Sequence, residues 1–194
     1  MDIYYEPGLE NEATVASESV AKVFLTNCKI LEKDRGQLLR YNKLVNGYEL
    51  RGLENQVPSL TLTTKDLFMT GSTSRDDDYF YGFSYYSAWV SVCRLWSIND
   101  QPEAEIKVKK QTFVRRLDHV LIHELGHIFV RNQEHYEPYI ITNEKTGHKT
   151  DTGEHCLDKR CVMSQFEDLV MLETHINDRY PGYFCERCRS SIRV

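Results

Sequence analysis

Two long segments of the chain repeat apolar residues at helical spacing. One covers residues 14–26, and the other, with the stronger pattern, covers residues 112–132. Apolar side chains of the stronger segment lie along one stripe: Val114, Leu117, Leu121, Leu125 and Phe129. Shorter helices are predicted over residues 36–45 and 167–178. The long second helix therefore has one face that must be buried against another part of the fold.

Strand signals cluster in the first half of the chain, ahead of the long helix. Short apolar or alternating segments predict strands at residues 3–5 and 60–63. Residues 79–96 are dense in aromatic and β-branched side chains, and they predict two strands with a break near residues 84–87. Strands that come first and a long helix that follows are typical of an α+β fold.

Composition excludes several classes of protein. The 194 residues are 41% hydrophobic and 27% charged, which is typical of a globular domain. A net charge of -5 without a basic stripe argues against binding to nucleic acid or to an anionic membrane. No apolar run approaches the roughly 20 residues that span a bilayer, and the acidic start MDIYYEPGLE does not resemble a signal peptide. We therefore expect a cytoplasmic protein.

The long helix carries the strongest chemical motif, HELGH at residues 123–127. Its i, i+4 spacing places the imidazoles of His123 and His127 on one helix face, where together they can hold one zinc ion. Glu124 can act as a general base toward a water molecule that the metal activates. Apolar residues precede and follow the motif, so a polar surface pattern explains it poorly.

The helix does not supply the third protein ligand that a catalytic zinc ion needs. The residues after it offer several candidates: His135, His148, His155, Glu134 and Glu154. Local spacing leaves this choice open.

Four of the six cysteines form two short-spaced pairs near the C-terminus. One pair is Cys156 and Cys161, and the other is Cys185 and Cys188. Four thiolates in this pattern suit a closed tetrahedral zinc site of the structural type. Disulfides are the weaker interpretation, because a cytoplasmic protein keeps its thiols reduced.

Together these motifs resemble the archaemetzincins, a family of metzincin zinc metallopeptidases. The signature of that family is HExxHxxGxxH, then a Cys, four residues, Cys-x-Met and a later Cys-x-x-Cys. The chain has HELGH at residues 123–127, HCLDKRCVM at residues 155–163 and CERC at residues 185–188. Segments of the first half are also similar, so the resemblance covers most of the chain from about residue 30 onward.

The resemblance implies a zinc-dependent peptidase with a metzincin-like α+β fold. A twisted mixed β-sheet and the active-site helix would form the upper lobe, above a small irregular lower lobe stapled by zinc. The catalytic zinc ion would be held by three imidazoles: His123, His127 and His155. The structural zinc ion would be held by four thiolates: Cys156, Cys161, Cys185 and Cys188.

Three further features follow from the same resemblance. Glu124 would be the catalytic base. Met163 would pack beneath the catalytic metal in a Met-turn without binding it. An edge strand of the upper lobe, expected near residues 88–93, would pair with an extended substrate peptide.

The chain departs from the signature of the family after His127. Val130 stands at the position of the signature's glycine, and Gln133 at that of its third histidine. His155 follows His127 by 28 residues in place of six, which implies an insertion of about 22 residues. Because a β-branched residue resists a positive φ, we expect the helix to continue for about one more turn.

The insertion is expected to form a hairpin, in which residues 136–142 pair with residues 147–153. His155 is favoured over His135 as the third ligand, because the residues after it keep the offsets of the family's signature. The hairpin could also cover the cleft or dock a partner. Two of its tyrosines are candidates for stabilising an oxyanion: Tyr136 and Tyr139.

We interpret the chain as one metallopeptidase domain, with an upper lobe at residues 1–132, the insertion at 133–154 and a lower lobe at 155–194. We expect a monomer that binds two zinc ions, one catalytic and one structural, and hydrolyses a peptide or protein substrate. The alternative is an inert module that binds peptides or proteins on the same zinc-stabilised scaffold. Glu124 argues against this alternative, because a purely structural zinc needs no base beside it.

Overall fold

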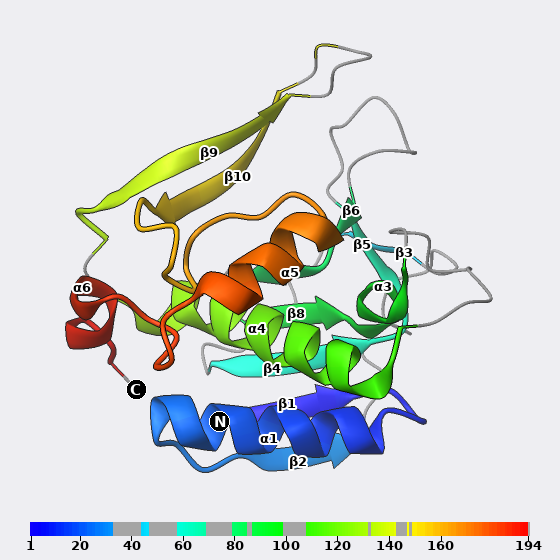
Figure 1. Cartoon of the computed structure of the whole chain (residues 1–194). Coiled ribbons are helices and arrows are strands. Elements are labelled where there is room, and N and C mark those ends of the chain that lie inside the picture. The colour runs from blue at the N-terminus through cyan, green and yellow to red at the C-terminus, as the bar shows by residue number, and fades with distance from the viewer. Residues whose placement is uncertain are drawn as a thin grey trace.

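Five strands form the main β-sheet of the computed structural model, in the order β2-β1-β4-β8-β7 (Figure 1). The structure describes residues 1–32, 44–46, 58–68, 79–84, 87–98, 108–131, 133–142, 147 and 149–193. The strands are β1 (Asp2–Tyr5), β2 (Lys29–Glu32), β4 (Ser59–Thr63), β7 (Gly82–Ser84) and β8 (Ala88–Ser91). Neighbouring strands are parallel except for β7, which is antiparallel to β8, so the sheet is mixed.

The prediction of an edge strand near residues 88–93 is wrong, because β8 pairs with β4 on one side and with β7 on the other. The edge at this end of the sheet is β7. All four residues of β8 are buried. A strand that is buried on both faces has no polar alternation, so its sequence does not reveal its place in the sheet.

Residues Val92–Trp96 form helix α3, where the sequence predicted a continuing strand. The rings of Trp96 and Phe113 stack with centroids 3.8 Å apart, which joins α3 to the start of the long helix. Tertiary packing therefore overrides the β propensity of these residues.

Helices α1 (Glu10–Phe24) and α4 (Lys110–Phe129) lie side by side against one face of the main sheet (Figure 1). The parallel strands β1 and β2 need a crossover connection, which α1 supplies. The rings of Phe24 and Phe129 join the ends of the two helices, with centroids 5.0 Å apart. Both predicted helices are confirmed, although each begins and ends earlier along the chain.

The expected extra turn of α4 is wrong, because the helix ends at Phe129. Val130 is extended, with φ -82° and ψ 114°, so the chain leaves the helix without a positive φ. The residues after the helix pair with the C-terminal segment: Val130 forms a β-bridge with Ile192, and the Arg131 amide donates to the Ser191 carbonyl at 3.0 Å. These bonds replace the helical bonds that a further turn would have made.

A smaller sheet of three strands lies beyond the main sheet, in the order β3-β5-β6. Its strands are β3 (Leu44–Asn46), β5 (Asp66–Phe68) and β6 (Tyr79–Phe80). Most of the helix predicted over residues 36–45 lies outside the described residues. Its last two positions belong to β3, so the prediction is wrong there.

The predicted hairpin is confirmed as β9 (Tyr136–Thr142) and β10 (Lys149–Cys156), which are antiparallel. It projects away from the main sheet, above the lower lobe (Figure 1). Its second strand runs three residues further than predicted, to Cys156, which pairs with Tyr136. The end of the hairpin at Cys156 therefore lies directly beside its start at Tyr136.

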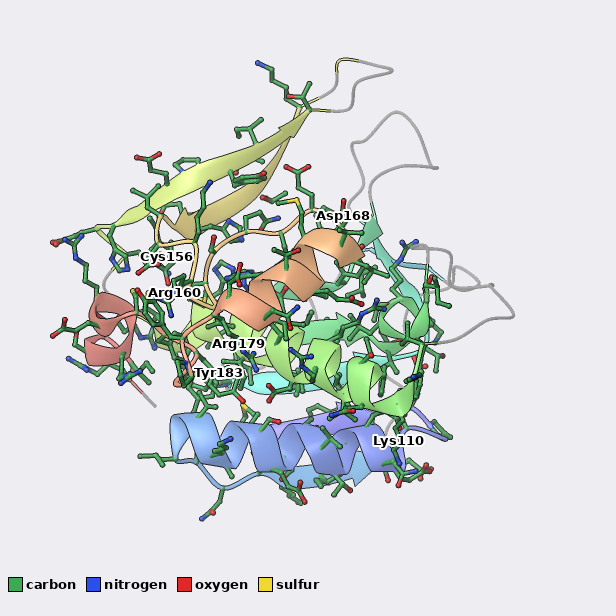
Figure 2. The ribbon with its side chains drawn as sticks, in the orientation of Figure 1. Lys110, Cys156, Arg160, Asp168, Arg179 and Tyr183 are labelled. Carbon is green, nitrogen blue, oxygen red and sulfur yellow. The ribbon has the colours of Figure 1, made fainter. Side chains whose placement is uncertain are left out.

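The segment expected to form the lower lobe, residues 155–194, contains α5 (Leu169–Asp178) and α6 (Glu186–Ser190). Polar contacts hold it to α4: Arg116 Nε donates to Glu173 Oε1 at 3.0 Å, and Arg179 Nη2 donates to Asp118 Oδ2 at 3.0 Å. Arg179 and Tyr183 lie together below α5, near α4 (Figure 2). The hydrophobic core is continuous through both lobes. None of the helices in the described part of the chain combines the length and apolar character that crossing a membrane requires.

Candidate functional site

Helix α4 carries two histidines and a glutamate in its buried C-terminal half. His123 and His127 are one helical turn apart, so their imidazoles lie on the same face. His123 is 3% exposed and Glu124 is 7% exposed. Burying a polar side chain costs free energy unless it has a polar partner. Buried histidines and carboxylates that lie close together are therefore typical of a functional site.

His155 on β10 joins the two helical histidines in one cluster, which we call the histidine cluster. The ligand nitrogens of His123, His127 and His155 all lie within 4.8 Å of one another. The ring centroid of His127 is 4.9 Å from that of His123 and 4.9 Å from that of His155. The structure thus brings together the three histidines that the family resemblance named, whereas His135 lies elsewhere.

Backbone carbonyls orient two of these imidazoles. His123 Nδ1 lies 2.7 Å from the Val162 carbonyl, and His155 Nδ1 lies 3.0 Å from the Gly153 carbonyl. A proton on each Nδ1 satisfies these carbonyls and leaves the Nε2 lone pair as the metal donor. His123 Nε2 and His127 Nε2 are 3.2 Å apart, so the donor atoms converge.

Burial keeps these histidines neutral. It lowers the pKa of His127 to about 3 and that of His155 to about 4, and it lowers the pKa of His123 well below its usual value. Neighbouring imidazoles add to the shifts of His123 and His127, since like charges oppose protonation. Neutral imidazole is the form that binds zinc, so this donor set fits that metal.

Glu124 lies beside the histidine cluster and against the edge strand β7. A Cβ atom on Gly82 would lie 2.5 Å from both Cγ and Oε1 of Glu124, so only glycine leaves room for this side chain. Burial raises the pKa of Glu124 to about 8, and a hydrogen bond with Ser84 opposes that shift. Gly82 and Ser84 belong to no motif in the sequence, and the pairing of β7 with β8 brings them to α4.

Met163 packs beneath the same stretch of α4. Its side chain is fully buried, and a Cβ atom on Gly126 would collide with its Sδ atom. The backbone of Met163 also holds β10, because the Cys156 amide donates to its carbonyl at 2.9 Å. Met163 therefore supports the helix at the residue directly before His127.

A second cluster of possible metal ligands lies at the base of the hairpin, around Cys156 (Figure 2). The ligand atoms of His135, Cys156, Cys185 and Cys188 all lie within 4.8 Å of one another. Cys161 is adjacent, and its Sγ accepts a hydrogen bond from the Cys185 amide at 3.3 Å. We call these five residues the cysteine cluster. His135 was not expected here, although the pairing of Tyr136 with Cys156 would have indicated its position.

The thiols of the cysteine cluster hydrogen-bond to one another. Hydrogen bonds with Cys161 and Cys188 lower the pKa of Cys156 to about 5, and hydrogen bonds with Cys156 and Cys161 raise the pKa of Cys188. None of the four cysteines is in a disulfide. The thiolate is the form of cysteine that binds zinc, so this cluster also fits that metal.

A pocket of about 750 Å³ opens beside the cysteine cluster. Its lining residues are His135, Leu157, Asp158, Tyr180, Phe184, Cys185, Glu186, Arg187 and Arg189. The described residues that line it do not include the clustered histidines or Glu124. Among the described residues, this pocket therefore borders His135 and Cys185 of the cysteine cluster and no member of the histidine cluster.

The two hairpin tyrosines face different clusters. The Tyr136 hydroxyl lies 3.3 Å from Cys188 Sγ, which corrects the expectation that it could reach the histidines. The Tyr139 ring lies 6.3 Å from the His155 ring between centroids, and its hydroxyl donates to Glu167. Of the two, only Tyr139 borders the histidine cluster.

No family model matches the chain, and no curated protein matches it. Among solved structures, the chain is similar to a zinc-dependent peptidase from Methanocorpusculum labreanum, with a TM-score of 0.61 at 16% sequence identity. The match covers 99% of this chain and 99% of that one. The chain therefore shares its fold with that protein over nearly its whole length.

Proposed function

We propose that this chain is a zinc-dependent peptidase of the archaemetzincin type, with its catalytic zinc ion on His123, His127 and His155. One observation carries the proposal. Three imidazoles converge within 4.8 Å, and a buried carboxylate, Glu124, follows the first of them in the chain. The similarity of fold to a zinc-dependent peptidase supports it.

The chemistry divides between the metal and the side chain of Glu124. A zinc ion on the three imidazoles would lower the pKa of a bound water toward neutrality and polarise a substrate carbonyl. The ionised form of Glu124, which the positive charge of a zinc ion would favour over the neutral acid, would take the proton of the attacking water and then give it to the leaving amine. The glycine at position 82 leaves room for the carboxylate on the β7 side of the helix.

The proposed substrate is an extended peptide that adds a strand to the edge of β7. Glu124 contacts β7 at Gly82, so a peptide paired with this strand would pass close to the base. Such pairing uses backbone hydrogen bonds, which most peptide sequences can make. Side-chain preference would then depend on the surfaces on either side of β7.

The cysteine cluster is proposed to hold a second zinc ion with a structural role. It joins the end of β10 to α6, two elements of a lobe with little regular secondary structure. A metal with four protein ligands can supply the cross-link that such a lobe lacks.

Glu124→Gln tests the proposed mechanism. The variant keeps the shape of the side chain but cannot take a proton, so hydrolysis of a synthetic peptide mixture should fall by about 10² to 10⁴-fold. Zinc content should not change, because Glu124 is not a proposed ligand. Glu18→Gln, at an exposed position of α1, is the matched control and should keep wild-type activity.

The same assay separates the peptidase from the inert binding module. Hydrolysis by the zinc-loaded protein that a chelator abolishes and added zinc restores is the result expected for the peptidase. Full activity in Glu124→Gln would contradict the assigned base. Zinc-loaded protein that binds peptides without cleaving any of them would favour the inert module.

A further inference from the structure

The cysteine cluster offers one donor more than a zinc ion uses. Structural zinc sites are almost always tetrahedral with four protein ligands, taken from Cys and His. Four thiols and one imidazole meet in this cluster: Cys156, Cys161, Cys185, Cys188 and His135. Either His135 or one thiol must therefore lie outside the metal's coordination sphere.

The distances favour His135 as a ligand. His135 Nε2 lies 3.1 Å from Cys188 Sγ and 3.8 Å from Cys185 Sγ, and Cys156 Sγ lies 3.9 Å from Cys185 Sγ. Separations in this range fit donors around a single zinc ion, whose bonds are about 2.0–2.3 Å long. Cys161 lies outside the set of four mutually close donors.

The local fold explains why a histidine reaches this point. His135 precedes the first residue of β9, and its carbonyl accepts a hydrogen bond from the Leu157 amide at 3.2 Å. This bond extends the hairpin ladder beyond the pair Tyr136–Cys156, so His135 is held beside Cys156. The side chain of His135 is 9% exposed and lines the pocket beside the cluster.

Cys161 has a different partner. Its sulfur accepts the Cys185 amide at 3.3 Å, and it is not among the four donors that all lie within 4.8 Å of one another. Its contacts with the thiols of Cys156 and Cys188 place it against the ligands.

We propose that His135 is a ligand of the second metal, which completes a Cys₃His zinc site with Cys156, Cys185 and Cys188. Cys161 then lies outside the coordination sphere and hydrogen-bonds the site. The metal clamps both ends of the inserted hairpin, through His135 before β9 and Cys156 at the end of β10. This assignment does not depend on peptide hydrolysis, because it concerns a site that the proposed reaction does not use.

Cobalt(II) substitution tests the ligand set. Thiolate-to-cobalt charge transfer reports only on the cysteine cluster, because the histidine cluster contains no sulfur. In Cys161→Ala this band should keep its wild-type intensity. In His135→Ala the cobalt d–d bands should shift, and a chelator should remove the metal from this site at a lower concentration. Cys28→Ala, a half-buried thiol of the upper lobe, controls for the loss of one cysteine.

The opposite pattern would overturn the proposal. In that pattern, the intensity of the charge-transfer band in Cys161→Ala falls by the contribution of one thiolate, and His135→Ala has the wild-type spectrum. If a variant does not fold, cadmium-113 NMR of the wild-type protein distinguishes the same two ligand sets. A chemical shift in the range of Cys₃His centres supports the assignment, and one in the range of four thiolates rejects it.

Discussion

The two clusters differ in the number of donors that they offer and in what lies beside them. The histidine cluster has three imidazoles, from α4 and β10, and the buried carboxylate of Glu124. The cysteine cluster has five donors and no comparable base among them. Zinc with three protein ligands keeps a position for water, whereas zinc with four does not. The number of donors therefore distinguishes a site suited to catalysis from a site suited to a structural metal.

One strand supplies both clusters. His155 and Cys156 are consecutive residues of β10, and successive side chains of a strand point to opposite faces. His155 accordingly lies with the helical histidines, and Cys156 lies with Cys185 and Cys188. A shift of one residue in the pairing of β10 would exchange the two and disrupt both sites.

The largest expected effect is on folding, from loss of the proposed structural metal. Cys188 is fully buried, and zinc binding contributes on the order of 10 kcal/mol to the folding of small zinc domains. Cys188→Ala should therefore lower the melting temperature strongly or abolish folding, measured by circular dichroism together with zinc content. His127→Ala, the matched loss of a histidine ligand, should have a much smaller effect. Equal losses in both variants would contradict the division of roles.

The next effect is on the rate of hydrolysis, from crowding the base. The added methyl group of Gly82→Ala would displace the Glu124 carboxylate, and misplacing a reacting group by about 1 Å can cost about 10²-fold in rate. Zinc content should not change. The double variant with Glu124→Gln should be no slower than Glu124→Gln alone. An additive loss would mean that Gly82 acts on something other than Glu124.

A smaller effect is expected where Met163 supports α4. Gly126→Ala would force its new Cβ atom against Met163 Sδ in a fully packed region, and such overpacking costs about 1–3 kcal/mol. Urea unfolding of the zinc-loaded protein measures the loss. Shortening the opposing side chain in Gly126→Ala/Met163→Ala should recover part of it. Wild-type stability of the single variant would show that this contact is not tight.

The smallest effects compare the two tyrosines of the hairpin. Tyr136→Phe removes a buried hydroxyl 3.3 Å from Cys188 Sγ and should destabilise the fold by about 1 kcal/mol. The hydrogen bond of Tyr139 is exposed, so Tyr139→Phe should cost less. Chemical denaturation of both variants tests the order. A larger loss from Tyr139→Phe would mean that the histidine side of the hairpin is held more firmly than the cysteine side.

Local patterns predicted the elements that carry the histidine cluster. The apolar stripe of 112–132 corresponds to α4, and the i, i+4 spacing places His123 and His127 on one face of any helix. The hairpin was expected from the insertion between His127 and His155, as residues 136–142 paired with residues 147–153. Predictions that needed knowledge of neighbouring strands were wrong, including the edge position of residues 88–93 and the strand over Val92–Trp96.

Side-chain chemistry and spacing within one helix or one short pair are local properties, so the sequence is enough to identify the residues that can bind a metal. How those donors divide between the two clusters depends on the tertiary structure. It brought His155 back to α4 after 28 residues and placed His135 among the cysteines. It also set Gly82 of β7 against Glu124. Each of these contacts joins segments far apart in the chain, and their register depends on packing and strand pairing that no local pattern encodes.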